Sequence, residues 1–465
     1  MKSLDLKSFR SYIASRTAVS EALIGQVGWT TAGYFLIQII RFLQNVILTH
    51  LLMPSLFGIM IIITSLRIGV ELFTDIGVGQ NLISNRNGFD ERFYNTAWTI
   101  QLIRGFLLAI IFFIFLPFLG RFYSEATLNS VLPITALLFI LTGAHSIGPI
   151  LAAKALDTKS IAQYEVRSAI LGSIITLSAV LVSPNVWGLV FGNILSTIAS
   201  TILSYFVMPN INYKMIIDRT FFREIMSFGR WIFLSSIVYF LSSNFDRVIL
   251  AKYISLTMLG VYGISRSLGD IIGQFALRLG NTIIFPLISS SDLEGISLSQ
   301  KIGTRRKQFL FISACGISIF IASGDVLVNL IYDERYKLAG TVLPWVGIST
   351  WLYVINTVSD SVMLGIRKPL YGALGNVMKF AVLLVFLPLA ALKYGIIGAV
   401  MISLAAEFGR YAVLTIAQIR QRISFVGQDV LVTLAMIAAV FGLRVAAHVL
   451  GLAGAVGGLF VFTTS

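Results

Sequence analysis

Long apolar segments follow one another along most of the chain, and short polar segments separate them. A helix of about 20 predominantly apolar residues crosses the hydrocarbon core of a bilayer. The pattern therefore predicts thirteen membrane-spanning helices, at residues 28–51, 56–82, 96–118, 131–150, 164–183, 186–208, 230–251, 258–285, 308–331, 341–364, 372–391, 396–417 and 429–449. A last apolar segment, 452–462, is shorter than a full span, and the sequence leaves open whether it completes a fourteenth.

The composition agrees with a membrane protein along the whole chain. Hydrophobic residues make up 57% and charged residues 12%, with a mean hydropathy of +0.87, whereas soluble proteins have about 25% charged residues. The single cysteine, Cys315, excludes an intrachain disulfide. Residues 1–27 are polar and basic and do not resemble a signal peptide, so we expect the first span to direct insertion.

Lysine and arginine residues are distributed unequally between the two sides of the membrane. Segments on the side of the N-terminus carry 21 of them, and segments on the other side carry 5. Basic residues are retained on the cytoplasmic side, so the N-terminus is predicted to be cytoplasmic. The net charge of +14 is then explained by the basic residues of the cytoplasmic segments, and we expect no nucleic-acid partner.

The chain contains an internal repeat. ILTHLLMPSLFGIM at 47–60 matches ILAKYISLTMLGVY at 249–262, which places Gly58 over Gly260, and VWGLVFGN at 186–193 matches IIGAVMIS at 396–403. Each half has six predicted spans, so both halves have the same orientation and are related by an axis along the membrane normal. The predicted fold class is an all-α polytopic membrane protein with two six-helix lobes around a central cavity, plus one or two extra C-terminal helices.

The repeat also sets the predicted domain boundaries. They are a cytoplasmic N-terminal segment (1–27), an N-lobe (28–208), a cytoplasmic linker (209–229), a C-lobe (230–417) and a C-terminal helix or hairpin (418–465). The linker mixes apolar and charged residues as an amphipathic helix does, so we expect it to lie along the inner membrane surface.

Charged residues occur inside the predicted spans at helical spacing. In TSLRIGVELFTDIGVG (64–79), Arg67, Glu71 and Asp75 are four residues apart, and RSLGDIIGQFALR has Arg266, Asp270, Gln274 and Arg278 at the same step. Residues at this spacing lie near one face of a helix. With Arg167 and Arg230, at the starts of two spans, counted in the adjoining cytoplasmic segments, nine basic residues fall inside the spans. Each costs about 2.5–3.5 kcal/mol at the membrane centre. We expect Lys379 and Arg410 to lie near the cytoplasmic face and the others to face protein or water.

The intramembrane charges favour a binding site for an anion. Apart from Glu165 and Asp429 at the starts of two spans, the nine bases are accompanied by seven acids, namely Glu71, Asp75, Asp246, Asp270, Asp325, Asp360 and Glu407, so a shared cavity would be positive. The guanidinium group binds phosphate with two parallel hydrogen bonds, and a carboxylate in such a cavity can load and release a proton or a sodium ion. The alternative is that these charges form local salt bridges that hold helices together.

Three segments resemble a known family. LLMPSLFGIM, DIGVGQNLI and VWGLVFGNILS are similar to segments of Wzx-type polysaccharide flippases, which belong to the multidrug/oligosaccharidyl-lipid/polysaccharide (MOP) exporter superfamily. The resemblance covers nearly the whole chain, although the last helix is shorter here. It implies transfer of an undecaprenyl-pyrophosphate-linked oligosaccharide across the bacterial inner membrane by alternating access, coupled to an ion gradient. It also implies polysaccharide polymerases and glycosyltransferases as partners.

On this interpretation two groups of residues are candidate site residues. The pyrophosphate is expected to bind to Arg41, Arg67, Arg104, Arg247, Arg266 and Arg278, and the coupling H⁺ or Na⁺ to Glu71, Asp75 and Asp270. No metal or cofactor is expected, because the chain has no HExxH or GxxxxGK[ST] motif and its three histidines are scattered.

Other functions stay open at this point. The sequence alone poorly distinguishes a polysaccharide flippase from a lipid II flippase of the same superfamily. A multidrug or cation antiporter would favour an acidic, aromatic cavity, which the excess of bases argues against. A membrane enzyme such as a glycan polymerase or ligase usually has a large outer loop, and the predicted outer loops are short.

Overall fold

The structure is a computed structural model that describes residues 6–279 and 295–451. Every long regular element in these ranges is a helix, and they contain no strand. Contacts divide the chain into two compact units. The first unit comprises Met1–Leu51, Thr74–Gly120 and Glu125–Phe233, and the second comprises Leu52–Phe73, Arg121–Ser124 and Leu234–Ser465.

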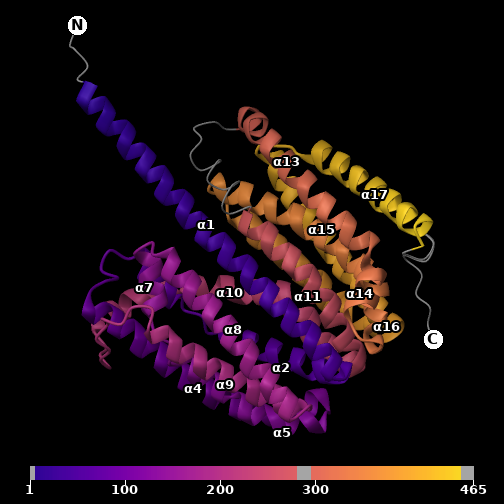
Figure 1. Ribbon diagram of the computed structural model, residues 1–465, viewed down its shortest axis with the longest axis horizontal. Coiled ribbons are helices and arrows are strands. Elements are labelled where there is room, and N and C mark those ends of the chain that lie inside the picture. Colours follow the sequence, from indigo (N-terminus) through magenta and orange to yellow (C-terminus); the bar gives the residue numbers. More distant parts are fainter. Residues whose placement is uncertain (1–5, 280–294, 452–465) are drawn as a thin grey trace. The chain divides into compact units, whose positions relative to one another are not determined.

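The first unit contains the helices of the N-terminal half except α2. They are α1 (Leu6–Leu51), α3 (Val78–Ser84), most of α4 (Glu91–Tyr123), α5 (Ala126–Thr135), α6 (Leu137–Gly143), α7 (Gly148–Lys154), α8 (Thr158–Val182), α9 (Val186–Tyr205) and the start of α10 (Arg219–Tyr253). Helix α8 packs against both α1 and α9, as Figure 1 shows.

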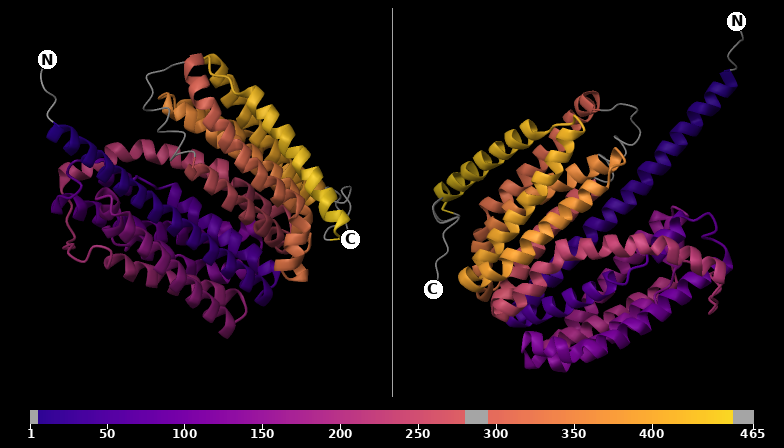
Figure 2. Two further views of the ribbon diagram at one scale, coloured as in Figure 1. Left: turned by 45° about the horizontal axis from the view of Figure 1, so that its top comes forward. Right: turned by 180° about the vertical axis from the view of Figure 1, so that it is seen from behind.

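The second unit combines α2 with the C-terminal helices. They are α2 (Pro54–Leu72), the rest of α10, α11 (Leu256–Leu279), α13 (Gly295–Ala322), α14 (Gly324–Ile331), the 3₁₀ helix η2 (Glu334–Tyr336), α15 (Leu338–Gly365), α16 (Leu370–Arg420) and α17 (Val426–Val449). Helix α15 packs against α11, α13 and α16, and α17 packs against α13. Figures 1 and 2 show α13, α15 and α17 side by side, around an apolar core that includes Leu310, Trp351 and Val432.

The described helices account for the thirteen predicted spans. Ten of them are long and apolar enough to cross a membrane, or eleven if the α13–α14 pair, bent by 64°, is one span. Helix α16 has 51 residues and would be about 77 Å long if it were straight, far more than the roughly 30 Å hydrocarbon core. Gly395, with φ 58° and ψ −138°, divides it into two spans. Helix α11 overlaps the predicted span 258–285 and carries three charged residues, but it is not among these ten, and residues 280–285 of that span lie outside the described residues.

The repeat predicted from Gly58 and Gly260 has a structural counterpart. Helices α2 and α11 cross at these two glycines, and the contacts are reciprocal. A Cβ atom on Gly58 would lie 2.1 Å from the Leu256 carbonyl oxygen, and one on Gly260 would lie 2.0 Å from the Pro54 carbonyl oxygen. Since both distances are shorter than any Cβ contact allows, only glycine permits this approach. Equivalent positions that face each other are what a twofold repeat requires.

The predicted helix 56–82 is wrong in its second half. Helix α2 ends at Leu72, and α3 begins only at Val78. Between them Asp75 accepts a hydrogen bond from the backbone N–H of Gly77 at 2.9 Å, and Gly77 adopts the left-handed conformation, with φ 62°. An aspartate that competes for backbone N–H groups and a left-handed glycine both end helices. Asp75 therefore does not continue the helical stripe of Arg67 and Glu71.

The predicted span 131–150 is also interrupted, at residues 144–147, between α6 and α7. The break leaves backbone carbonyls without helical partners. Tyr205 donates a hydrogen bond to the Ala144 carbonyl at 2.8 Å, and the Gln101 amide donates to the His145 carbonyl at 3.2 Å. Side chains of α9 and α4 thus stabilise a broken helix, as apolar surroundings require.

The linker before α10 differs from the expected surface helix. Residues 211–218 have no regular secondary structure, and α10 begins at Arg219. This segment is hydrogen-bonded to polar side chains at the start of α4. Asn95 binds the Asn212 carbonyl and the Lys214 N–H at 3.0 and 2.9 Å, and Thr96 accepts from the Asp218 N–H at 3.0 Å. The polar face of α4 thus binds this segment, and its expected position along the inner membrane surface stays a prediction.

The two units also bear on the predicted domains. Helix α2 lies in the second unit, whereas the predicted N-lobe, 28–208, includes it. The predicted lobes describe a repeat in the chain and stay a prediction, as does their arrangement around a central cavity. The possible fourteenth span, 452–462, lies outside the described residues.

A candidate anion-binding site in the second unit

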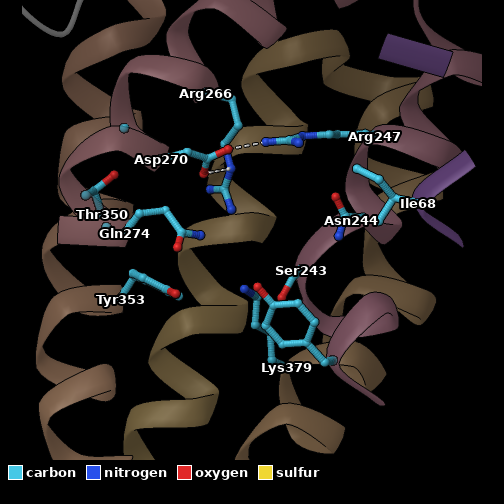
Figure 3. A pocket seen from close by; sticks show the side chains of 13 residues that line it. Ile68, Ser243, Asn244, Arg247, Arg266, Asp270, Gln274, Thr350, Tyr353 and Lys379 are labelled. Carbon is cyan, nitrogen blue, oxygen red and sulfur yellow. Dashed lines mark hydrogen bonds and ion pairs between the residues drawn. The ribbon is translucent and has the colours of Figure 1, made fainter. Parts of the chain in front are cut away.

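A cavity of about 220 Å³ lies within the second unit. Five helices contribute side chains to it, with most of the charge on α10, α11 and α16 (Figure 3). Its lining consists of Ile68 from α2; Tyr239, Ser243, Asn244 and Arg247 from α10; Arg266, Gly269, Asp270, Gly273 and Gln274 from α11; Thr350 and Tyr353 from α15; and Lys379 from α16.

Helical spacing brings the charged residues of the cavity together. Arg266, Asp270 and Gln274 follow one another at four-residue steps along α11, so they share the face that the helix turns toward the cavity. The glycines of the same face, Gly269 and Gly273, pack against α15, where an added Cβ would lie 2.8 Å from Thr350 Oγ1 and 3.0 Å from the Tyr353 ring. The small residues thus let α15 approach while the long polar side chains reach the cavity.

Two arginines share one acid in this site. The Arg247 guanidinium donates a hydrogen bond to Asp270, and Arg266 Nε lies 3.3 Å from the other carboxylate oxygen. Figure 3 shows Asp270 between the two guanidinium groups. With Lys379, the described lining therefore has three bases and a single acid.

The remaining acids of this region lie behind the lining. Asp246 is buried and accepts a hydrogen bond from Tyr262 at 2.5 Å. The positive charges of Arg266 and Arg247 also stabilise its carboxylate. Glu407 is buried beside Lys379, with Nζ 2.7 Å from Oε1, and accepts a second bond from Asn356 at 2.9 Å.

A fourth base completes this cluster. Arg410 donates a hydrogen bond to Asp360, and its second contact reaches Glu407 at 4.0 Å. The cluster thus holds four bases (Arg247, Arg266, Lys379, Arg410) and four acids (Asp246, Asp270, Asp360, Glu407). It is balanced in charge but polarised, because three of the four bases line the cavity and only one of the four acids does.

The neutral part of the lining is rich in hydrogen-bonding groups. Ser243, Asn244 and Gln274 lie on α10 and α11, and Thr350 and Tyr353 on α15. Hydroxyl and amide groups donate to phosphate oxygens and exchange hydrogen bonds with sugar hydroxyls. The described residues contain no group of three acid, histidine or cysteine side chains that could hold a metal ion.

The structure brings three of the nine predicted site residues together in the cavity: Arg247, Arg266 and Asp270. Arg67 and Glu71 lie on α2 and Arg278 on α11, all in the second unit but outside the cavity lining. Arg41, Arg104 and Asp75 belong to the first unit. There Arg104 donates a hydrogen bond to Thr74 Oγ1 at 3.1 Å, and Arg41 is exposed.

Sequence reasoning missed Lys379 as a site residue. Lys379 and Arg410 are both buried in ion pairs of the charged cluster, and their expected position near the cytoplasmic face stays a prediction. A lysine and a glutamate in neighbouring apolar spans are a signal for such a pair, although the sequence alone does not identify the partner.

Comparison with known proteins identifies the family of this chain. The sequence model of a family described as "Polysaccharide biosynthesis protein" matches residues 47–340, more than half of the chain. Teichuronic acid biosynthesis protein TuaB of Bacillus subtilis (strain 168) is 20% identical over 348 residues, which are 75% of this chain and 72% of that protein.

Solved structures show the same fold. The lipid II flippase MurJ, in an inward closed conformation, superposes with a TM-score of 0.68 at 12% identity, covering 91% of this chain and 93% of MurJ. An inward-facing multidrug resistance MATE family transporter of the MOP superfamily gives a TM-score of 0.60 at 13% identity, covering 86% and 95%. These likenesses confirm the predicted fold class, an all-α polytopic membrane protein with the two-lobed fold of these transporters. By the extent of the sequence match, the chain belongs to the polysaccharide biosynthesis protein family.

Proposed function

We propose that the protein is a flippase that moves an undecaprenyl-pyrophosphate-linked oligosaccharide from the cytoplasmic to the outer leaflet of the bacterial inner membrane by alternating access. The observation that carries this proposal is the pair of arginines, Arg247 and Arg266, at a cavity with one lining acid. Two guanidinium groups provide ten N–H donors, which suits the many oxygens of a diphosphate. In this proposal the N-terminus is cytoplasmic, as the distribution of basic residues predicts.

The size of the cavity supports a compact head group. Pockets for drug-sized molecules measure about 300–1,000 Å³, and this one measures about 220 Å³. It has room for a diphosphate and part of the adjoining sugar, while the lipid tail stays in the bilayer. Ser243, Asn244 and Gln274 are placed to bind sugar hydroxyls.

Ion coupling is part of the proposal. The charged cluster is balanced while the cavity is empty, so a dianionic diphosphate brings two uncompensated negative charges into a buried site. Unpaired buried charge is costly, which favours entry together with H⁺ or Na⁺. Asp270 lines the cavity and is the first candidate for the coupling acid, with Glu71 and Asp75 as the others.

A reconstitution assay tests the site. The purified protein is placed in vesicles with fluorescent undecaprenyl-pyrophosphate-linked oligosaccharide, and exposure on the far leaflet is measured. We expect Arg247→Gln and Arg266→Gln each to reduce transport at least about tenfold, since a hydrogen bond to a charged group contributes about 1.5–3 kcal/mol. The exposed Arg86 provides the control, because Arg86→Gln should transport as the unchanged protein does. Wild-type rates in both site variants would remove the proposed role.

The same assay tests the other predicted arginines, Arg41, Arg67, Arg104 and Arg278, by glutamine replacement. An imposed proton or sodium gradient, applied in turn, identifies the coupling ion. Polysaccharide polymerases and glycosyltransferases are proposed partners, and their genes next to this one would support the polysaccharide substrate.

A lipid II flippase is the second candidate, because MurJ has the same fold. Deletion of the gene distinguishes the two functions. Loss of peptidoglycan precursor export should be lethal, whereas loss of a surface polysaccharide should leave cells viable without their polymer. A multidrug antiporter for cations is disfavoured by three bases in the cavity lining.

A further inference from the structure

Asp270 occupies an unusual position among the charged residues of the cavity. Its side chain is 40% exposed, whereas those of its two partners, Arg247 and Arg266, are 21% and 16% exposed. The carboxylate therefore lies on the open side of the guanidinium groups. An anion that enters the cavity meets Asp270 where it would bind to the arginines.

The carboxylate does not satisfy both arginines. Its contact with Arg247 is a hydrogen bond, but the 3.3 Å contact with Arg266 Nε is an ion pair without hydrogen-bond geometry, and this Nε has no hydrogen-bond partner among the described residues. Two guanidinium groups offer more donors than one carboxylate accepts with good geometry. A diphosphate, with more oxygens and two charges, would bind the pair more completely.

Asp270 is also the acid that can leave its position most easily. Asp246 and Glu407 are buried and bound to their own partners, Tyr262 and Lys379, so moving either would leave a buried charge unpaired. Asp270 is 40% exposed and can turn further into the cavity instead, at a lower desolvation cost.

We propose that Asp270 is a built-in counter-anion that holds Arg247 and Arg266 in the empty site and is displaced by the diphosphate of the substrate. This inference rests on the proposed function. The cost of displacing the carboxylate keeps the affinity for diphosphate moderate, and the return of the carboxylate to the arginines promotes release on the far side of the membrane. A transporter must release what it binds, so an internal competitor favours turnover over affinity.

Calorimetric titration of the purified protein with inorganic pyrophosphate tests the proposal. We expect Asp270→Asn to bind pyrophosphate at least about tenfold more tightly than the unchanged protein, because a hydrogen bond to a charged group contributes about 1.5–3 kcal/mol. The matched control is Asp246→Asn, which removes the same charge from behind the lining and keeps an acceptor for Tyr262. We expect a smaller gain in affinity for it.

A structure with bound pyrophosphate supplies the second measurement, in which Asp270 should have left both guanidinium groups. Equal or weaker binding by Asp270→Asn would show that the acid positions the arginines, and the inference would be wrong. An equal gain from Asp246→Asn, or an Asp270 still bridging beside bound pyrophosphate, would contradict it too. If neither the unchanged protein nor Asp270→Asn binds pyrophosphate, the anion site itself is refuted, and the proposed function loses its main support.

Discussion

The buried ion pair between Arg306 on α13 and Asp429 on α17 allows a quantitative test of how this membrane protein tolerates charge. Nη1 of Arg306 lies 2.7 Å from Oδ1 of Asp429, and both side chains are almost fully buried. The guanidinium also lies over the Phe425 ring, 4.5 Å from its centroid, and Asp429 accepts a hydrogen bond from Tyr411 at 3.1 Å. The pair adjoins the apolar core between α13 and α17.

Replacing Arg306 by methionine keeps most of the apolar stem but leaves the Asp429 carboxylate without its cation. Removing one partner of a buried pair costs about 3–5 kcal/mol, whereas replacing both is often neutral. We therefore expect Arg306→Met to lower the free energy of unfolding by about 4 kcal/mol. The double variant with Asp429→Asn should lie within about 2 kcal/mol of the unchanged protein, because no buried charge remains.

Equilibrium unfolding by a denaturing detergent in mixed micelles, followed by tryptophan fluorescence, measures these differences. Trp351, in the same apolar core, reports on it. The control is Arg335→Met, which breaks an exposed pair with Asp333 and should cost less than about 1 kcal/mol. The reasoning is refuted if Arg306→Met costs no more than this control, or if the double variant loses the sum of both single changes.

Three further outcomes follow from local structure. Gly395→Ala should destabilise the protein by about 1–3 kcal/mol, seen in the same unfolding assay, because φ is 58° there. Asn95→Ala should speed tryptic cleavage after Lys214 by removing the bonds that hold residues 212–214 on α4; an unchanged rate would contradict this. Hydrogen bonds from Ser160 lower the pKa of Asp157, so the capping of α8 should stabilise at neutral pH and be lost as pH falls through that lowered pKa. Asp157→Asn should abolish this pH dependence of unfolding.

The spans could be predicted from the sequence because their signal is local. Twenty apolar residues in a row identify a span without knowledge of its neighbours, and the thirteen predicted segments all correspond to described helices. The breaks at 73–77 and 144–147 were missed, since hydropathy averages over them. Asp75 and Gly77 carried a turn signal, whereas the break at 144–147 depends on bonds from Gln101 and Tyr205, which lie on other helices.

The site could be predicted only in part, for a related reason. Arg266 and Asp270 are one helical turn apart, so periodicity alone placed them on one face. Their partner Arg247 was a candidate because it is a charge in an apolar span. The pairing of Lys379 with Glu407, 28 residues away, and of Arg444 with Asp325, 119 residues away, depends on tertiary packing. From the sequence alone, each of these two pairs is equally consistent with a charged cavity or with a salt bridge that holds two helices together.

The structure separates these two uses of buried charge by their access to the cavity. Arg444 binds Asp325 with two hydrogen bonds of 2.6 Å, and Arg306 is paired with Asp429. The side chains of Arg444 and Arg306 are only 2% and 0% exposed and lie outside the cavity lining, so these pairs hold helices together. At the cavity, in contrast, Arg247 and Arg266 share the carboxylate of Asp270 at the lining. The negative charge of the buried Asp246 also attracts both guanidinium groups, without a hydrogen bond to either. Charge balance without full hydrogen bonding keeps the empty site stable and leaves guanidinium donors available, and this combination is what a transient anion site requires.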